Sequence, residues 1–351
     1  MRAAIYYGPQ DVRVENRPEP VPAPDQVLLK VTRSGMCGTD ASEWKAGPII
    51  FPLNKAHPIS GLKGPMVLGH EFIGEILEVG KEVSDFSAGD RVASGAGISC
   101  GECSRCSEGR TNLCREYVTH GLNLDGGMAE MVAVAASTLV PIPAELDDNR
   151  AGLAQPLAVG LHAARRSGAQ DGDSVILIGA GAIGTFVLAG LKFLNSARVI
   201  VLDFEGSRLD RASRLGADHV VPVGDTADES LRELLGSSGA DVVIEASGAP
   251  GQLNRAAELI RRGGTILQVG LPSKPQMVNL HQIVMSEITV ETTLAHVCAE
   301  DMGAALEILQ TTQLGAELLE GVYSLKELPD QLEKLATGQL QGKVLFDPHL
   351  E

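Results

Sequence analysis

Four cysteines stand close together in the stretch CGECSRCSEGRTNLC, at Cys100, Cys103, Cys106 and Cys114. The spacing C-x2-C-x2-C-x7-C in a Gly/Ser-rich loop predicts a tetrahedral zinc site in which thiolates fill every position. An iron–sulfur cluster is the alternative, because its bacterial run also begins C-x2-C-x2-C. Here the last gap is longer than in that run and Arg115 follows instead of proline, so zinc is favoured. A closed site of this kind stabilises a loop and leaves no position for a substrate.

A glycine-rich turn indicates a second kind of chemistry. The hexapeptide GAGAIG places Gly179, Gly181 and Gly184 at G-x-G-x-x-G spacing, with Ala182 and Ile183 inside it. This pattern alone is weak, because the chain holds 40 glycines, but the apolar strand VILI precedes it and the apolar helix TFVLAGLKFL follows. The glycines allow a tight turn, a close approach of backbone amides to a pyrophosphate, and packing of helix on strand. A turn without a ligand remains the alternative.

Asp203 supports the nucleotide interpretation. It closes the next apolar strand, VIVLD, about twenty residues after the glycine turn, where a carboxylate binds the hydroxyls of the adenosine ribose. A carboxylate there repels a 2′-phosphate, so NAD is favoured over NADP. Arg208 nearby leaves room for use of both cofactors.

A second metal candidate consists of Cys37 in SGMCGTD and of His70 and Glu71 in VLGHEFIGEI. A lone cysteine or histidine usually serves only packing. In a chain that also has a nucleotide-binding half, these residues suggest an open zinc site. Such a site has a thiolate, an imidazole, an oxygen ligand and a free position for a substrate oxygen.

Two regions with different patterns of apolar residues position these side chains. The first 150 residues contain short Val/Ile/Leu runs ended by glycines, as in QVLLKVTRSG and EFIGEILEVG, and predict strands joined by turns. From about residue 155, apolar runs without alternation are interleaved with helical patterns, which is typical of a parallel sheet covered on both faces. A chain of 351 residues is also expected to form two domains.

Composition excludes several classes of function. Hydrophobic residues make up 44% and charged residues 21%, as in a soluble globular protein. The formal net charge of −16 repels phosphate backbones, so nucleic acid is not an expected partner. The N-terminus lacks the apolar core of a signal peptide, and the apolar run Ser174–Leu191 is interpreted as strand, turn and helix rather than as a membrane span. We expect a cytoplasmic protein without a membrane partner.

The sequence resembles the zinc-dependent medium-chain dehydrogenases/reductases, the alcohol dehydrogenase superfamily. The motifs CGTD, GHEFIGE, GDRV, the four-cysteine lobe, DGGMAE, PLAVGLHAARR and GAGAIG occur in that family's order over nearly the whole chain. The stretches AGPIIFPLNKAHPISGLKGPMVLGHEF and THGLNLDGGMAEM look most like 2,3-butanediol dehydrogenases, near sorbitol and threonine dehydrogenases.

The resemblance implies a two-domain α/β fold. A GroES-like, β-rich catalytic domain is expected over 1–154 and 297–351, with the structural zinc lobe at about 96–115. A Rossmann domain with a doubly wound parallel sheet for NAD is expected over 155–296, and the active site lies in the cleft. Two zinc ions per subunit, one catalytic and one structural, and a homodimer or homotetramer follow from the same likeness.

The resemblance also assigns roles to single residues. It places Cys37 and His70 on the catalytic zinc, with Glu71 close enough to alternate with water. Asp40 matches a carboxylate that orients the histidine ligand. Thr39 matches the hydroxyl that takes the substrate's proton.

Two positions depart from the family pattern. Relatives in the polyol and butanediol branch have EPLAV, and their glutamate is a zinc ligand directly or through water, whereas this chain has Gln155. Many relatives have a histidine where this chain has Ser42. An amide oxygen can still coordinate zinc but brings no charge, so the site with Cys37 and His70 has a net charge of +1. We expect a stronger Lewis acid that holds its ion less tightly, unless Glu71 joins the ligands.

The expected reaction is reversible oxidation of a secondary alcohol, such as a vicinal diol or polyol, with hydride moving to NAD. Thr39 accepts the proton, and Ser42, a ribose hydroxyl or water passes it to solvent. The loops EASGAP and QVGLPS should border the nicotinamide through residues that include Ser247, Val269 and Gly270.

The remaining histidines and the last cysteine carry less information. His57, His120 and His296 have two alternative interpretations: each lines the substrate side of the site, or each has a structural or surface role. Cys298 is interpreted as a packing residue.

Three competing functions are open at this stage. One is an NAD(P)H-dependent reductase that keeps only the structural zinc, with Gln155 marking a decayed catalytic site. Another is a non-catalytic protein that binds NAD as a sensor. A zinc-ribbon DNA binder is disfavoured by the acidic charge.

Overall fold

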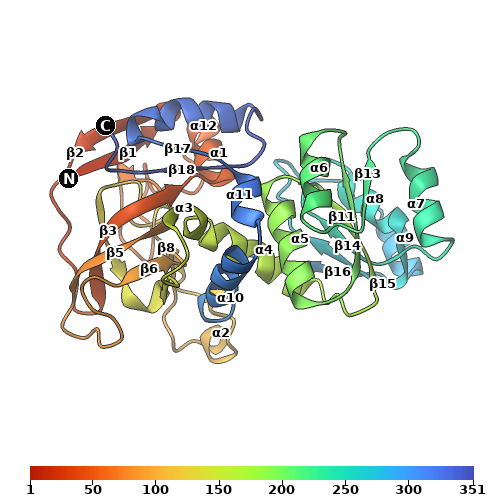
Figure 1. The fold of residues 1–351 in the computed structure, drawn as a ribbon, viewed down its shortest axis with the longest axis horizontal. Coiled ribbons are helices and arrows are strands. Elements are labelled where there is room, and N and C mark those ends of the chain that lie inside the picture. The colour runs from red at the N-terminus through yellow and green to blue at the C-terminus, as the bar shows by residue number, and fades with distance from the viewer. The chain divides into compact units, whose positions relative to one another are not determined.

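The computed structural model describes residues 1–351, and the chain forms two compact units (Figure 1). Unit 1 comprises Met1–Gln155 and Val297–Glu351, and unit 2 comprises Pro156–His296. Unit 2 is therefore an insertion in the chain of unit 1. None of the helices is both long enough and apolar enough to cross a bilayer.

Unit 1 is built on β-sheets. Its largest sheet has seven strands in the order β10-β6-β5-β3-β18-β17, with β9 also paired to β3. A three-stranded sheet has the order β2-β1-β4, and β7 pairs with β8. The bounds are β1 (Arg2–Gly8), β2 (Asp11–Asn16), β3 (Gln26–Gly35), β4 (Met66–Val67), β5 (Glu71–Val79), β6 (Arg91–Ser94), β7 (Gly97–Ile98), β8 (Val118–Thr119), β9 (Met131–Ala135), β10 (Leu139–Pro141), β17 (Leu319–Tyr323) and β18 (Lys343–Phe346).

The helices of unit 1 range from single turns to the 14 residues of α10. They are α1 (Gly38–Ala46), α2 (Ser104–Ser107), α3 (Asp148–Ala151), α10 (Cys298–Thr311), α11 (Leu314–Leu318) and α12 (Leu328–Ala336), with single 3-10 turns at Thr111–Leu113, Ala136–Thr138 and Leu325–Glu327. The helix α4 (Ala154–Arg166) begins in unit 1 and continues into unit 2.

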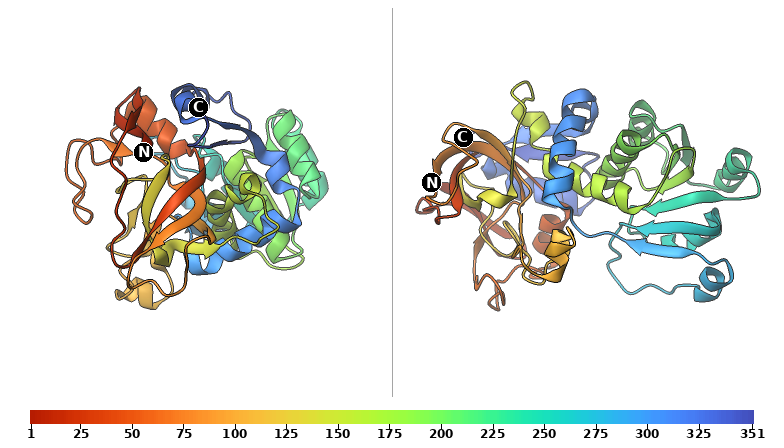
Figure 2. Two further views of the ribbon diagram at one scale, coloured as in Figure 1. Left: turned by 60° about the vertical axis from the view of Figure 1, so that its left-hand side comes forward. Right: turned by 90° about the horizontal axis from the view of Figure 1, so that it is seen from below.

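The C-terminal segment completes the large sheet of unit 1. Strand β18 pairs antiparallel with β3, through Leu345 opposite Gly35 and Phe346 opposite Ser34. Figure 2 shows the N-terminal strands, in red, and the C-terminal elements, in dark blue, side by side. Because β18 is buried along its whole length, this pairing contributes to the core as well as to the sheet.

Unit 2 is a six-stranded parallel sheet in the order β13-β12-β11-β14-β15-β16. The strand order reverses between β11 and β14, which is the Rossmann arrangement, so the predicted fold class is confirmed. The bounds are β11 (Ser174–Ile178), α5 (Ala182–Leu194), β12 (Arg198–Asp203), α6 (Ser207–Arg214), β13 (His219–Pro222), α7 (Ala227–Leu235), β14 (Ala240–Glu245), α8 (Gln252–Leu259), β15 (Ile260–Gln268), α9 (Leu280–Met285) and β16 (Thr289–Thr292).

Helices cover both faces of the unit 2 sheet. Figure 1 shows α5 and α6 on one side of the strands and α8 and α9 on the other. In β11, Val175 and Leu177 pack into the core with α5 and α6, whereas Ile176 and Ile178 pack into the core with α7 and α8. Burial on both faces explains why the strands are continuous apolar runs.

Candidate active site, metal centres and nucleotide turn

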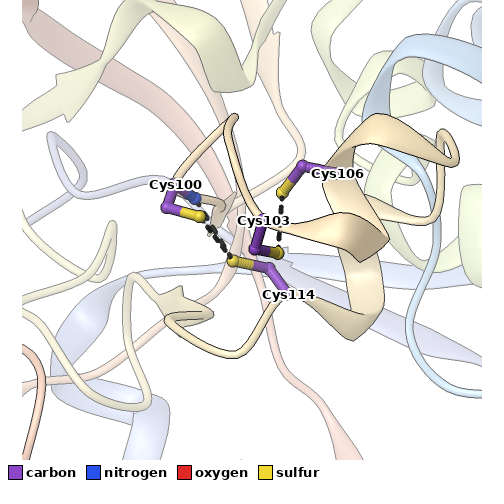
Figure 3. Close-up of side chains that lie close together, drawn as sticks. All are labelled: Cys100, Cys103, Cys106 and Cys114. Carbon is purple, nitrogen blue, oxygen red and sulfur yellow. Dashed lines mark hydrogen bonds between the residues drawn. The ribbon is translucent and has the colours of Figure 1, made fainter.

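The four-cysteine lobe lies between β7 and β8, and its thiol groups converge (Figure 3). The sulfur atoms of Cys100 and Cys114 are 3.5 Å apart, and those of Cys103 and Cys106 are 3.6 Å apart. All four sulfurs lie within 4.8 Å of one another. Tetrahedral zinc with four thiolates needs sulfur–sulfur separations of about 3.8 Å. The group therefore fits a zinc ion.

Backbone donors surround these sulfurs. Hydrogen bonds from the N–H groups of Cys106 and Arg115 lower the pKa of Cys103 to about 6. Burial raises the pKa of Cys114 to about 11, although the N–H groups of Cys100 and Glu116 each donate to its sulfur at 3.3 Å. The N–H donors stabilise thiolates, and a bound cation would keep all four sulfurs ionised.

The start of α1 presents three groups that can take part in chemistry. Cys37 is the N-cap residue of this helix, and its N–H donates to Asp40 Oδ2 at 2.9 Å. The hydroxyl oxygen of Thr39 lies 3.8 Å from the sulfur of Cys37. A thiol, a hydroxyl and a buried carboxylate are therefore held by one helical turn.

His70 and Glu71 meet this turn from the start of β5. The potential ligand atoms of Cys37, His70 and Glu71 lie within 4.8 Å of one another. His70 Nδ1 faces Asp40 Oδ1 at 3.9 Å, and neither of these buried atoms has a hydrogen-bond partner. A thiol, an imidazole and a carboxylate form a donor set that zinc accepts. The residues that the sequence singled out for an open zinc site are thus brought together.

The charges of this site act on each other. Burial disfavours the protonated ring of His70, but the charges of Cys37 and Asp40 outweigh burial and raise its pKa to about 9. Burial raises the pKa of Asp40, and the charge of His70 opposes that rise. In the metal-free protein His70 is therefore protonated at neutral pH, and a metal must displace this proton.

Lys343 is a site residue that sequence reasoning missed. Its Nζ lies 2.5 Å from Glu71 Oε2 and 2.8 Å from Oε1, and it also donates to the carbonyl oxygen of Met36 at 2.6 Å. Both side chains are buried, with exposed fractions of 8% for Lys343 and 2% for Glu71. A lysine that opens the buried strand KVLF was the available signal, since a buried lysine needs an anionic partner. Glu71 is thus one member of an ion pair, which the sequence did not anticipate.

Two other expected site residues lie on helices. Gln155 is half-buried in the first turn of α4. Ser42 is exposed on α1, and its hydroxyl donates to the carbonyl oxygen of Gly38 at 2.9 Å. Ser42 therefore retains its oxygen lone pairs for a second hydrogen bond.

The glycine turn has the geometry that the motif predicts. Gly179 has φ of +100°, which favours glycine, and a Cβ on Gly184 would lie 1.9 Å from the Gly179 carbonyl oxygen. Gly181 is the N-cap residue of α5, whose first helical residues are Ala182 and Ile183. The first N–H groups of a helix lack partners within the helix and can bind an anion.

A cavity of about 790 Å³ lies in unit 2 beside this turn. Its lining includes Gly179, Gly181, Asp203, Arg208 and Ser247. Asp203 ends β12 and accepts hydrogen bonds from the N–H groups of Ala180 at 2.6 Å and Phe204 at 2.7 Å. The carboxylate expected to bind a ribose is therefore anchored at the rim of the turn.

Glu245 is the second residue that sequence reasoning missed. It ends β14 and is fully buried, and its backbone carbonyl accepts the N–H groups of Val269 at 2.8 Å and Gly270 at 2.9 Å. Its side chain accepts from the N–H of Ser247 at 2.8 Å. All three predicted loop residues, Ser247, Val269 and Gly270, therefore contact one glutamate. A charged residue at the end of the apolar run VVIE was the available signal.

The three open histidines and Cys298 lie outside both groups of metal-ligating residues. His57 accepts the Ser60 N–H at 3.2 Å within a turn, and His120 Nδ1 contacts the Asp125 carbonyl oxygen at 2.9 Å. His296 is buried at the last position of unit 2. Cys298 lies 3.5 Å from the Thr138 carbonyl oxygen, and burial raises its pKa to about 11.

Comparisons with known proteins agree with this fold and these groups of residues. Residues 23–144 match the family model of the alcohol dehydrogenase GroES-like domain, and residues 182–311 match that of the zinc-binding dehydrogenases. Sorbitol dehydrogenase of Bacillus subtilis (strain 168) is 32% identical over 339 residues, which cover 95% of this chain and 93% of the relative.

Solved structures show the same fold. The crystal structure of 2R,3R-butanediol dehydrogenase from Bacillus subtilis has a TM-score of 0.90 and 29% identity, covering 99% of each chain. A zinc-binding dehydrogenase from Sinorhizobium meliloti 1021 bound to NADP has a TM-score of 0.85 and 29% identity, also over 99% of each chain.

A GroES-like unit with an inserted Rossmann unit and two groups of metal-ligating residues defines the class of zinc-binding dehydrogenases. The chain belongs to this alcohol dehydrogenase family, the medium-chain dehydrogenases/reductases, so the predicted resemblance is confirmed. It is accordingly an oxidoreductase of the alcohol and polyol dehydrogenase type.

Proposed function

We propose that this protein is a zinc- and NAD-dependent dehydrogenase of secondary alcohols that carry a neighbouring hydroxyl, such as vicinal diols and polyols. The observation that supports this most is the convergence of the ligand atoms of Cys37, His70 and Glu71 within 4.8 Å, next to the hydroxyl of Thr39. Its similarity to sorbitol and butanediol dehydrogenases supports the substrate class.

Several residues of unit 1 act together to remove the hydroxyl proton of the alcohol. A zinc ion held by Cys37 and His70, with Gln155 or Glu71 as a further ligand, supplies Lewis acidity that lowers the pKa of an alcohol hydroxyl. Thr39 accepts the hydroxyl proton, and Ser42, a ribose hydroxyl or water passes it to solvent. The carboxylate of Asp40 faces His70 Nδ1 at 3.9 Å and would favour a proton on that nitrogen.

The ion pair with Lys343 favours Gln155 over Glu71 as the oxygen ligand. A carboxylate already neutralised by a buried ammonium group attracts a cation less than a free one. With one thiolate, a neutral imidazole and a neutral amide, the proposed zinc site would have a net charge of +1.

Residues of unit 2 support NAD as the hydride acceptor. The glycine turn and the N-terminus of α5 offer N–H groups to the pyrophosphate. Asp203 at the rim of the cavity disfavours a 2′-phosphate, although Arg208 lines the same cavity.

A metal count combined with a substrate screen tests this function. Purified protein should hold about two zinc ions per chain, and Cys37→Ser and Cys103→Ser should each lose one of them. The zinc-loaded protein should form NADH from a panel of vicinal diols, polyols and secondary alcohols. A count of one ion, unaffected by Cys37→Ser, would identify a reductase with structural zinc only. Binding of NAD without turnover on any alcohol would identify a sensor.

Thr39→Val provides a matched test of the proton acceptor. The variant preserves the shape of the side chain, so zinc content should stay the same. We expect kcat to fall about a hundredfold or more, as for loss of a general base. Unchanged kcat would assign the proton to another group.

We further propose that the protein is a homodimer formed through β16. This strand ends the sheet of unit 2 and has an unpaired edge. Exposed apolar side chains lie on this strand and on α9, the helix that precedes it in the chain, among them Val290 at 39% and Val284 at 72%. A second copy related by a two-fold axis can pair with the edge and cover these side chains. Light scattering should give twice the chain mass, and Val284→Glu with Val290→Lys should give monomers.

A further inference from the structure

Glu245 occupies a special position in the sheet of unit 2. It is the last residue of β14, opposite Ile178 of β11 on one side and Gln268 of β15 on the other. The strand order reverses between β11 and β14, and in open parallel sheets ligands bind outside the carboxyl ends of the strands at this reversal. Glu245 is fully buried there.

The carboxylate of Glu245 organises the loop that follows β14. Its Oε1 accepts the N–H of Ser247 at 2.8 Å and the N–H of Gly248 at 3.0 Å, and the Ser247 hydroxyl also donates to it. Gly179 of the glycine turn approaches the same loop, since a Cβ on it would lie 3.0 Å from the Ser247 nitrogen. The side chain thus supports a loop packed against the phosphate-binding turn.

The loop after β15 is held by the same residue. Gln268 Nε2 donates to Glu245 Oε2 at 2.6 Å and to the carbonyl oxygen of Gly270 at 2.7 Å. Both neighbours of this nitrogen are acceptors, which determines the orientation of the amide. Gly270 packs so closely that a Cβ would lie 2.6 Å from Glu245 Oε2 and 2.1 Å from the Gly248 nitrogen. The two loops and Glu245 therefore form one packed unit.

Every donor that reaches this carboxylate is neutral. The donors are two backbone N–H groups, one hydroxyl and one amide. Such a set satisfies the lone pairs of an ionised carboxylate without cancelling its charge. Glu71 differs, because Lys343 pairs with it.

We propose that Glu245 is a positioning residue of the nicotinamide site that also favours the oxidised cofactor. It orders both loops through its hydrogen bonds, and its uncompensated negative charge attracts the positive ring of NAD⁺ but not the neutral ring of NADH. This inference rests on the proposed function, because it requires that unit 2 bind NAD.

A charge effect of Glu245 and a purely structural role predict different changes in the affinities for NAD⁺ and NADH. Loosening of the loops weakens both forms of the cofactor together. Loss of a fixed charge that acts on the ring would weaken only the oxidised form, by about tenfold for an interaction of about 1.4 kcal/mol.

Glu245→Gln is the main test, with the dissociation constants of NAD⁺ and NADH measured by calorimetry and by NADH fluorescence. We expect the ratio of the NAD⁺ constant to the NADH constant to rise about tenfold. Asp241→Asn is the control, because it removes a carboxylate near the opposite end of β14 that is paired with Arg261. Its ratio should equal that of the wild type.

Gln268→Lys is a second variant that leaves Glu245 in place. A lysine there supplies a cation to the carboxylate, so the ratio should rise in the same direction, even if Glu245→Gln fails to fold. If the ratio of the NAD⁺ constant to the NADH constant is unchanged in the variants that fold, and both nucleotides still bind, the charge effect is overturned. The proposed function is not affected by that result. Wild-type protein that binds neither nucleotide overturns both.

Discussion

Two buried glutamates at strand ends have opposite surroundings. Glu71 begins β5 in unit 1 and forms an ion pair with Lys343. Glu245 ends β14 in unit 2 and is bound only by neutral donors. Both are almost fully buried, with exposed fractions of 1% and 0%.

Burial alone therefore does not determine whether a carboxylate contributes a charge to its site. The pair in unit 1 is neutral as a whole, so the charge beside the metal ligands is set by Cys37 and Asp40. In unit 2 the donors to Glu245 are all neutral, so none of them cancels the charge of a carboxylate at the end of the sheet. The partners decide the electrostatic effect.

The largest expected effect comes from removing the cation of the first pair. Lys343→Met leaves Glu71 buried without a partner, and the free energy of unfolding of the zinc-free protein should fall by about 3–5 kcal/mol in urea titrations. The double variant Glu71→Gln with Lys343→Met should recover most of this loss. A single variant as stable as the wild type would show that the pair is not a buried ion pair in solution.

The corresponding change in unit 2 should be milder. Glu245→Gln keeps the shape of the side chain but turns one acceptor into a donor that faces the amide of Gln268. We expect a loss of about 1–3 kcal/mol, typical of unsatisfied buried polar groups. If this loss reached that of Lys343→Met, the two glutamates would not differ in the way described.

The pH dependence of zinc binding tests how the charges around His70 act in unit 1. Since the pKa of His70 in the zinc-free protein is raised to about 9, zinc must displace a proton at any lower pH. Its affinity at this site should therefore rise with pH, by up to about tenfold per unit, and level off near pH 9. Competition with a chromophoric chelator measures this slope. In Lys343→Met the plateau should move to higher pH, because the charge of Glu71 then adds to the attraction for the His70 proton.

The smallest effect is expected from Gln155→Glu. If residue 155 is a zinc ligand, a carboxylate there brings the site to neutrality, and zinc retention should increase about tenfold. The pH profile of hydride transfer should shift as well. Unchanged metal affinity and pH profile would place residue 155 outside the ligand set, and Glu71 would then be the remaining oxygen ligand despite Lys343.

The sequence predicted those parts of the site that depend on local geometry. The glycine turn and the cysteine lobe each lie within one short stretch, so the spacing of their residues restricts their geometry. The fold class followed from apolar runs that are buried on both faces of a parallel sheet.

Lys343 and Glu245 were missed because topology creates their partners. Lys343 contacts Glu71 across 272 residues of chain, through the pairing of β18 with β3. Glu245 meets Gln268 through strand register and meets Ser247 through a loop conformation. A single sequence shows neither relationship, although each residue stood out as a charge in an apolar run.

The position of β18 after unit 2 in the chain has a consequence for biosynthesis. Unit 2 is one continuous segment, so it can fold as soon as its last strand has been made. Unit 1 must wait, because the strand that joins β3 to β17 and carries Lys343 is synthesised after unit 2. On a ribosome unit 2 therefore completes its fold before unit 1. A nascent chain that stops short of β18 exposes an open sheet edge and a glutamate without its lysine.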